Sequence, residues 1–447
     1  MELLCNAYST TSDDEPEPDS EPKSKPVSRN PLFPPSKRPK PESSYPLVEH
    51  SSVSLPDQRY SNLHNEVPVA GRYVSKRERA LSGAIVSTVL EQGQSQNPAA
   101  QLYLNQVVMG SISDSDIPRD ILSSLRHHPK GIVQQNKLSG RLFSTLCCHT
   151  KAVNTIQWSP TYAHLLASAG MDHSICIWNV WSRHQKLARA LSFHDAAVND
   201  VKWSPQGLSV LSCGHDSSLR LIDVEKGIEI QNFKEEQVIR VIKFHPNNPN
   251  LFLSGGSKGS LKLWDIRRGN VVHEYIRGLG PILDVEFSIN GRQFISSSDV
   301  SGVNMSENSV IVWDILREIP LSNQVYVEAY TCPCIRHHPF DPYFVAQSNG
   351  NYIAIFSSSP PFRLDKYRRY ENHGVSGFPI KCNFSLDGEK LVSGSSDGFI
   401  YVYNCRSTKL DRKIKAHEQA CVDVAIHPIL PNIIASCSWH GDISVFE

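Results

Sequence analysis

The chain has 447 residues, of which 40% are apolar and 20% charged, so it holds enough apolar material to bury a large core. Its 45 basic residues balance 45 acidic ones, and no net charge drives it onto a nucleic acid or a membrane surface. It contains no run of about 18 apolar residues to span a bilayer, and the opening MELLCNAY lacks the basic start of a signal peptide. The 11 cysteines show no disulfide or metal spacing, which predicts a reducing, intracellular compartment.

Residues 1–70 are rich in proline and serine and lack apolar clusters, so we expect a mostly disordered extension. Its charge is sorted into an acidic part, Asp13 to Glu21, followed by a basic part, Lys23 to Lys40. Within the basic part, residues 36–40 read Ser-Lys-Arg-Pro-Lys, which suits either a nuclear import signal or a solvated linker.

Residues 71–137 have an intermediate composition and are expected to form a partly helical linker. Lys76 to Glu91 has a helix-compatible composition, and Asp116-Ile117-Pro118 reads as the start of a second helix that ends before Pro129. We expect both helices on the outside of the folded domain or against partners.

From Leu138 onward a hydrophobic anchor residue recurs every 42–49 residues, and short apolar runs separated by turn residues lie between the anchors. A period in the low forties with four short strands per unit is the signature of a propeller blade. The sequence therefore predicts an all-β fold, a seven-bladed β-propeller over residues 138–447. The anchors are Trp178, Ile222, Trp264, Trp313, Phe356, Tyr403 and Phe446.

The last blade lacks an outer strand, because the sequence ends one residue after the anchor Phe446. An open ring leaves an unpaired edge, so the missing strand must come from elsewhere in the chain. Residues 140–146 have a suitable composition. We expect them to pair with the last strand and close the ring.

Three blades carry a histidine, a serine and an aspartate at matching positions. The residues are His149, Ser168, Asp172 and Trp178 in blade one, His194, Ser212 and Asp216 in blade two, and His373, Ser393, Asp397 and Tyr403 in blade six. This spacing resembles the WD40 family, and the resemblance implies the family's structural hydrogen-bond network across the strands of each blade. Such a trio also suits acyl transfer, but an enzyme does not need three copies of its active site. We therefore expect no catalytic residues.

Two insertions interrupt the period, residues 300–306 in blade four and residues 360–370 between blades five and six. Loops that project from a rigid scaffold are frequent binding sites. The second insertion mixes cations with aromatic rings, which suits phosphate contact and base stacking, although an ordinary solvated connection is the alternative. The candidate binding residues are Phe362, Arg363, Lys366, Arg368 and Arg369.

Cys332 and Cys334 precede His337 and His338, a combination that invites a zinc interpretation. The pattern lacks a second ligand pair, and it falls where blade five needs its innermost strand. We expect these residues in the core, and we expect no metal and no cofactor.

Within the WD40 family, the C-terminal third is similar to the pre-mRNA-processing factor 17 group and its relative, WD repeat-containing protein 25. The resemblance implies a nuclear, non-catalytic scaffold associated with pre-mRNA splicing that binds proteins of a ribonucleoprotein complex. Direct RNA contact stays open, cytoplasmic residence is the other localisation, and no membrane or small-molecule substrate is expected. The segments that carry the resemblance are residues 362–364, 373–378, 415–421 and 438–442, with residues 72–77, 153–158 and 345–352 most like the second protein.

A different function is suggested by Trp264-Asp265-Ile266-Arg267, which resembles the WDxR motif of substrate receptors for cullin-4 ubiquitin ligases. In that interpretation Arg267 contacts the ligase adaptor. Lys258 stands where the motif has an aspartate, so the match is partial.

Overall fold

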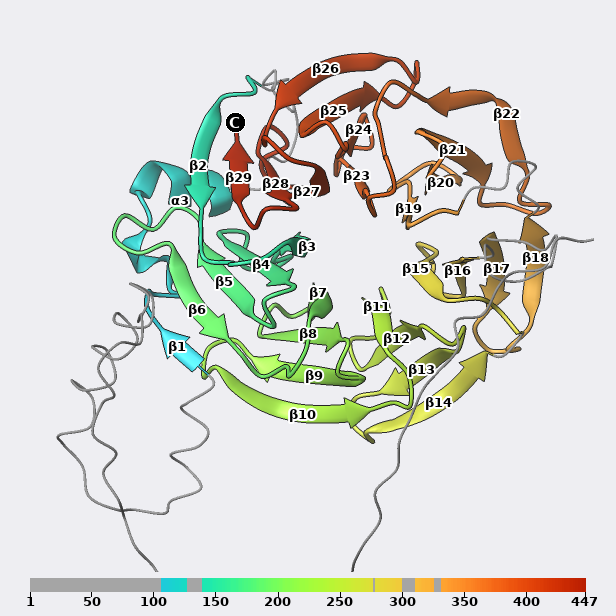
Figure 1. The fold of residues 1–447 in the computed structure, drawn as a ribbon, viewed down its shortest axis with the longest axis horizontal. Coiled ribbons are helices and arrows are strands. Elements are labelled where there is room, and N and C mark those ends of the chain that lie inside the picture. The colour runs from blue at the N-terminus through green and yellow to red at the C-terminus, as the bar shows by residue number, and fades with distance from the viewer. Residues whose placement is uncertain (1–105, 127–138, 276–277, 300–309, 325–330) are drawn as a thin grey trace, which may run out of the picture. The chain divides into compact units, whose positions relative to one another are not determined.

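Seven antiparallel sheets stand around a central channel in the computed structural model (Figure 1). The structure describes residues 106–126, 139–275, 278–299, 310–324 and 331–447. The predicted tail, the predicted helix at residues 76–91 and the insertion at residues 300–306 lie outside these residues. The described elements belong to one compact unit, residues 93–447, and confirm the predicted seven-bladed propeller.

Each blade is a sheet whose first strand lines the channel and whose last strand lies at the rim (Figure 1). Blades one to four contain β3 (Val153–Trp158), β4 (Leu165–Gly170), β5 (Ile175–Asn179), β6 (Leu187–Leu191); β7 (Val198–Trp203), β8 (Ser209–Gly214), β9 (Ser218–Asp223), β10 (Ile228–Lys234); β11 (Ile239–Phe244), β12 (Leu251–Gly256), β13 (Leu261–Asp265), β14 (Asn270–Tyr275); and β15 (Ile282–Phe287), β16 (Gln293–Ser298), β17 (Val310–Asp314), β18 (Pro320–Gln324).

The remaining blades follow the same plan, and all seven predicted anchors lie on third strands. Blades five to seven contain β19 (Cys334–His337), β20 (Tyr343–Ser348), β21 (Tyr352–Ser357), β22 (Leu364–Tyr370); β23 (Cys382–Phe384), β24 (Lys390–Ser393), β25 (Phe399–Asn404), β26 (Leu410–Lys415); and β27 (Cys421–Ile426), β28 (Ile434–Ser438), β29 (Ile443–Phe446) with β2 (Leu142–Leu146).

The ring closes between the two ends of the propeller. β2 pairs antiparallel with β29, and Leu142 stands opposite Phe446 while Leu146 stands opposite Ile443. This confirms the predicted source of the outer strand. In the closed ring, the innermost strand of each blade contacts the innermost strands of both neighbouring blades.

The interior consists of seven separate apolar clusters, one at each junction between neighbouring blades. At the closing junction, Val153 and Trp178 of blade one pack with Val422 and Ile443 of blade seven. Stability therefore depends on contacts between successive blades, as in other repeat architectures.

Three elements before the closing strand pack on the propeller. β1 (Gln106–Val108) adds a fifth strand to the rim of blade one by pairing with β6. The 3₁₀ helix η1 (Asp114–Asp116) and helix α3 (Arg119–Arg126) follow, and Leu122 of α3 packs on the cluster between blades seven and one. No helix within the described ranges is long and apolar enough to cross a membrane.

Candidate binding surfaces

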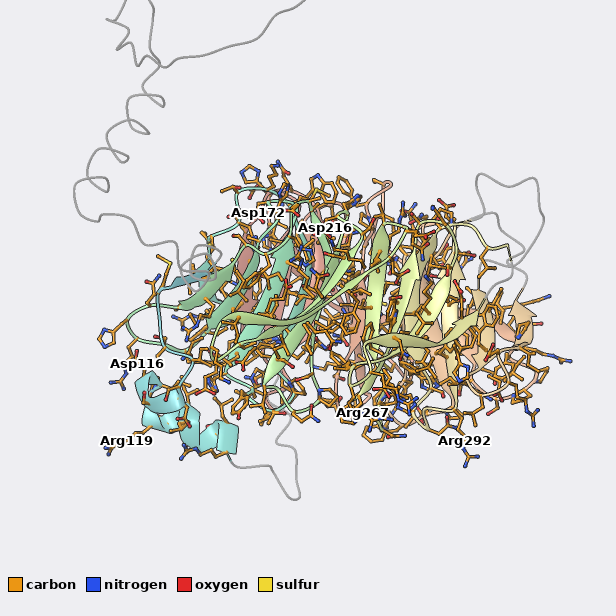
Figure 2. The ribbon with its side chains drawn as sticks, turned by 90° about the horizontal axis from the view of Figure 1, so that it is seen from below. Asp116, Arg119, Asp172, Asp216, Arg267 and Arg292 are labelled. Atoms are coloured by element: carbon orange, nitrogen blue, oxygen red, sulfur yellow. The ribbon has the colours of Figure 1, made fainter. Side chains whose placement is uncertain are left out.

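The propeller has two opposite faces, and we name each by one residue that lies on it. Asp172 and Asp216 lie on one face, and Arg267 and Arg292 lie on the other (Figure 2). The turns between second and third strands lie on the Asp172 face, and the turns that join first to second and third to fourth strands lie on the Arg267 face.

The polar set of blade one forms a connected hydrogen-bond network. His149 Nδ1 lies 3.0 Å from Asp172 Oδ2, and Nε2 lies 2.8 Å from Ser168 Oγ. Trp178 Nε1 donates to the same Oγ at 2.9 Å. Burial raises the pKa of Asp172, but hydrogen bonds from His149 and Ser174 outweigh it and hold the pKa well below its usual range.

Blade two repeats this arrangement up to its anchor. His194 Nδ1 lies 2.9 Å from Asp216 Oδ2, and Nε2 lies 2.8 Å from Ser212 Oγ. The anchor Ile222 has no donor for the serine, so the network ends there. In both blades the serine is fully buried and bound on more than one side, which leaves no access for a substrate. The arrangement cross-links strands and is unsuited to acyl transfer.

Blade six connects its four predicted residues differently. His373 Nδ1 lies 3.0 Å from Tyr403 Oη, and Gln347 Nε2 of blade five lies 2.6 Å from His373 Nε2. Ser393 donates to Gln347 Oε1 at 3.3 Å, not to His373. Asp397 lies nearer the surface and accepts hydrogen bonds from Tyr401 and Lys413, so the structure does not bring it to His373.

Buried carboxylates fasten neighbouring blades around the channel. Each belongs to the innermost strand of one blade and accepts a backbone N–H from the innermost strand of the next. The pairs are Ile242 N to Asp200 at 3.2 Å, Ile335 N to Asp284 at 2.8 Å and Ile156 N to Asp423 at 3.1 Å.

Each of these carboxylates also has a cation beside it, so the channel charges are paired. The ion pairs are Lys202–Asp200 at 2.6 Å, Arg336–Asp284 at 2.7 Å and Lys381–Asp423 at 3.7 Å. Burial lowers the pKa of Lys381, but Asp423 and Asp200 outweigh it and raise the pKa above its usual value. We assign these groups to holding the ring together.

The mouth of the channel on the Asp172 face is a hollow with free functional groups. It is a cavity of about 320 Å³, and its rim holds Met171, His215, Arg240 and Trp439. Trp439 packs edge-on against Phe378 with ring centroids 5.4 Å apart. Within the described part of the chain, the exposed Arg240 has no ion-pair partner. Trp439 and an unpaired cation that line the same channel mouth suit a peptide segment of a partner protein.

The sequence prediction missed this mouth. In the sequence, Trp439 stands out only as part of the family-like segment 438–442. A usable signal was present, because a tryptophan occupies the turn position that Met171 and His215 take in blades one and two. Such a tryptophan is not an anchor and needs another explanation.

The predicted insertion at residues 360–370 is wrong in its local structure, because residues 364–370 form β22, the rim strand of blade five. Phe362 is 3% exposed and packs in the cluster between blades four and five, so it is buried and not free to bind. Lys366, Arg368 and Arg369 are exposed. They lie in or beside a bulge of the strand.

Other predicted residues also have defined places. Arg267 lies on the Arg267 face with its side chain 64% exposed, and Asp265 holds it at 2.9 Å. Cys332 and Cys334 are buried, and Cys334 begins the innermost strand of blade five, as predicted. Among the described residues no cluster of histidine, cysteine and carboxylate side chains fits a metal ion.

Comparison with known proteins gives a consistent picture. The family model for the WD domain, G-beta repeat, matches residues 140–179, 185–223, 228–265 and 365–404. Each match begins on the rim strand of one blade or two residues before it and ends on the third strand of the next.

Three relatives illustrate the range of similarity. WD repeat-containing protein 25 of Mus musculus is 39% identical over 310 residues, which is 67% of this chain and 56% of the relative. Pre-mRNA-processing factor 17 of Homo sapiens is 32% identical over 413 residues, which is 90% of this chain and 66% of the relative. The U5 small nuclear ribonucleoprotein 40 kDa protein of Homo sapiens is 28% identical over 288 residues, covering 61% and 75%. The chain thus spans less than two thirds of the length of the first two relatives.

Proposed function

The chain is a WD40-repeat protein that resembles WD repeat-containing protein 25 and pre-mRNA-processing factor 17, and on that premise we propose that it is a non-catalytic scaffold for proteins of the nuclear pre-mRNA splicing machinery. The observation that carries the proposal is the 413-residue similarity to pre-mRNA-processing factor 17. This length exceeds the span from residue 138 to residue 447, so the likeness includes part of the N-terminal extension. A shared fold alone does not require that.

The arrangement of polar groups supports binding over catalysis. The histidine, serine and aspartate groups recur from blade to blade, and each serine lies inside a sheet. The channel cations are paired with carboxylates. Free polar and aromatic groups gather at the channel mouth on the Asp172 face, where a partner segment can dock.

The experiment that tests this proposal is affinity purification of the tagged protein from nuclear extract, with and without RNase, followed by mass spectrometry. We expect splicing proteins that survive RNase. We expect Trp439→Ala to lose at least part of them, because it removes the aromatic group at the mouth. Phe340→Ala is the matched control, since this phenylalanine is 69% exposed in a turn at the opposite end of a blade.

Two results contradict the proposal. One is recovery of no splicing protein by the wild-type chain. The other is recovery of a cullin-4 ligase adaptor without splicing proteins, with loss of the adaptor on Arg267→Ala. That result assigns the protein to the ubiquitin-ligase receptors, for which the exposed Arg267 is the contact.

A further inference from the structure

The rim strand of blade five contains an outward bulge. In the pairing of β22 with β21, Arg369 stands opposite Ala354, and the next pair is Leu364 with Phe356. Ile355 therefore faces residues 365–368, so the extra residues are pushed out of the ladder. We call residues 363–368 the rim bulge.

Hydrogen bonds fix the shape of the rim bulge. Asp365 Oδ1 accepts the backbone N–H of Tyr367 at 3.0 Å and that of Arg368 at 3.1 Å, which closes a tight turn. Arg368 Nη2 donates to the carbonyl oxygens of Cys405 and Arg406 in blade six, each at 3.3 Å. The bulge is therefore anchored to its own turn and to the neighbouring blade.

Tyr367 stands at the tip of this anchored turn with its side chain free. The residue is 98% exposed, and its ring and hydroxyl make no contact within the described part of the chain. An aromatic ring on a rigid support contributes nothing to the core, and both of its faces are open. Such a ring is suited to stacking on a flat partner.

Exposed cations stand close to Tyr367 in the sequence. Arg363 and Lys366 are exposed, and neither forms an ion pair with another described residue. Arg406 of blade six is 86% exposed and lies 3.7 Å from Glu389. Because Arg368 joins the bulge to residues 405–406, the positive charges continue from blade five to blade six.

We propose that the rim bulge is a contact site for single-stranded RNA, in which Tyr367 stacks on a base while Arg363 and Lys366 bind neighbouring phosphates. An open ring among cations is the combination that single strands require, since every base offers a stacking face and every linkage a phosphate. An acidic peptide needs an apolar pocket beside the cations, and the other aromatic residues of the segment 360–370, Phe362 and Tyr370, are buried. This proposal does not depend on which proteins bind to the propeller.

The first test measures binding of the full-length protein to a fluorescein-labelled 12-nucleotide uridine RNA by fluorescence anisotropy at several salt concentrations. We expect Tyr367→Ala to weaken binding about tenfold and Tyr367→Phe to bind within about twofold of wild type. Lys366→Ala should lower the slope of log K against log salt by about 0.7. Phe340→Ala, another exposed aromatic residue in the same blade, should bind like wild type.

The second test locates the contact, because the basic segment at residues 23–40 can itself attract RNA. Ultraviolet cross-linking with the same RNA, followed by mass spectrometry of the peptides, should recover Tyr367. Cross-links confined to other segments, or a Tyr367→Ala variant that binds like wild type, overturn the proposal. A third contrary result uses a polyglutamate peptide. If this peptide competes with the RNA, and if Lys366→Ala abolishes binding of the peptide while Tyr367→Ala does not, the site is one for acidic peptides. In the affinity purification with RNase, we expect Tyr367→Ala to retain the splicing proteins. The RNA test is therefore separate from the test of the scaffold function.

Discussion

Blade one and blade six carry the same polar sequence pattern but connect it in two ways. In blade one, His149 binds Asp172 and Ser168, and the indole of Trp178 completes the network inside one sheet. In blade six the anchor is Tyr403, whose hydroxyl reaches the histidine instead of the serine. The chemistry of the anchor therefore decides whether the serine binds the anchor of its own blade or a residue elsewhere.

The consequence for blade six is a network that crosses a blade boundary. Ser393 and His373 both bind Gln347 of blade five, while Asp397 remains near the surface. Blade one thus secures its own strands, and blade six secures its junction with the preceding blade. Both networks are structural, and the groups free for binding lie elsewhere.

The largest difference is expected from the anchor of blade one. Trp178→Ala removes a buried ring and the hydrogen-bond donor of Ser168, so the free energy of unfolding should fall by about 3–5 kcal/mol. Urea denaturation followed by intrinsic fluorescence measures this loss. A loss below about 1 kcal/mol contradicts the role assigned to the blade-one network.

Loss of the aspartate should also destabilise blade one more than blade six. Asp172→Ala strands His149 and the Thr150 N–H, so we expect a loss of about 2–3 kcal/mol. Asp397→Ala removes contacts of a partly exposed carboxylate, and the expected loss is below about 1 kcal/mol. Thermal unfolding of the two variants side by side measures the two losses. Equal losses would show that the two aspartates have equivalent roles in their hydrogen-bond networks.

Blade six should respond to mild acid. Burial lowers the pKa of His373 to about 4, below its ordinary 6.5. Between these values the unfolded chain binds a proton that the folded chain excludes, so stability is complete above about pH 6.5 and falls as the pH drops toward 4.

At pH 5 this effect amounts to about 2 kcal/mol for His373, measured as the change in unfolding free energy from pH 7.5. The buried His417 and His427, whose pKa values are also lowered to about 4, add to the pH dependence. His373→Gln should show a shallower slope than wild type. An unchanged slope would mean that His373 is protonated in the folded state.

The sequence predicted the parts of the fold that repeat. The anchor spacing located every third strand, and the truncated last blade identified residues 140–146 as its missing strand. It did not predict β22, because the four bulged residues break the two-residue alternation that marks a strand. Phe362 was misassigned as a binding residue because adjacent cations do not reveal that its ring turns into the core.

The proposed binding surfaces were only partly predictable, for a geometric reason. Residues distant in sequence, such as Arg240 and Trp439, reach one channel mouth only when the ring closes. The partner of His373 likewise comes from a neighbouring blade, and no pattern within blade six indicates Gln347. The cations of the rim bulge were visible in the sequence, but the exposure of Tyr367 was not.

The most direct test of the scaffold function is sedimentation of nuclear extract through a glycerol gradient, with detection of the protein in each fraction. The account predicts that part of the protein migrates with the large spliceosomal particles, far from the position of a free 50.0 kDa chain. Trp439→Ala should shift it toward the free position, while cooperative thermal unfolding shows that the propeller of this variant is still folded. A wild-type protein that sediments only as the free chain, in extract where those particles are intact, contradicts the account.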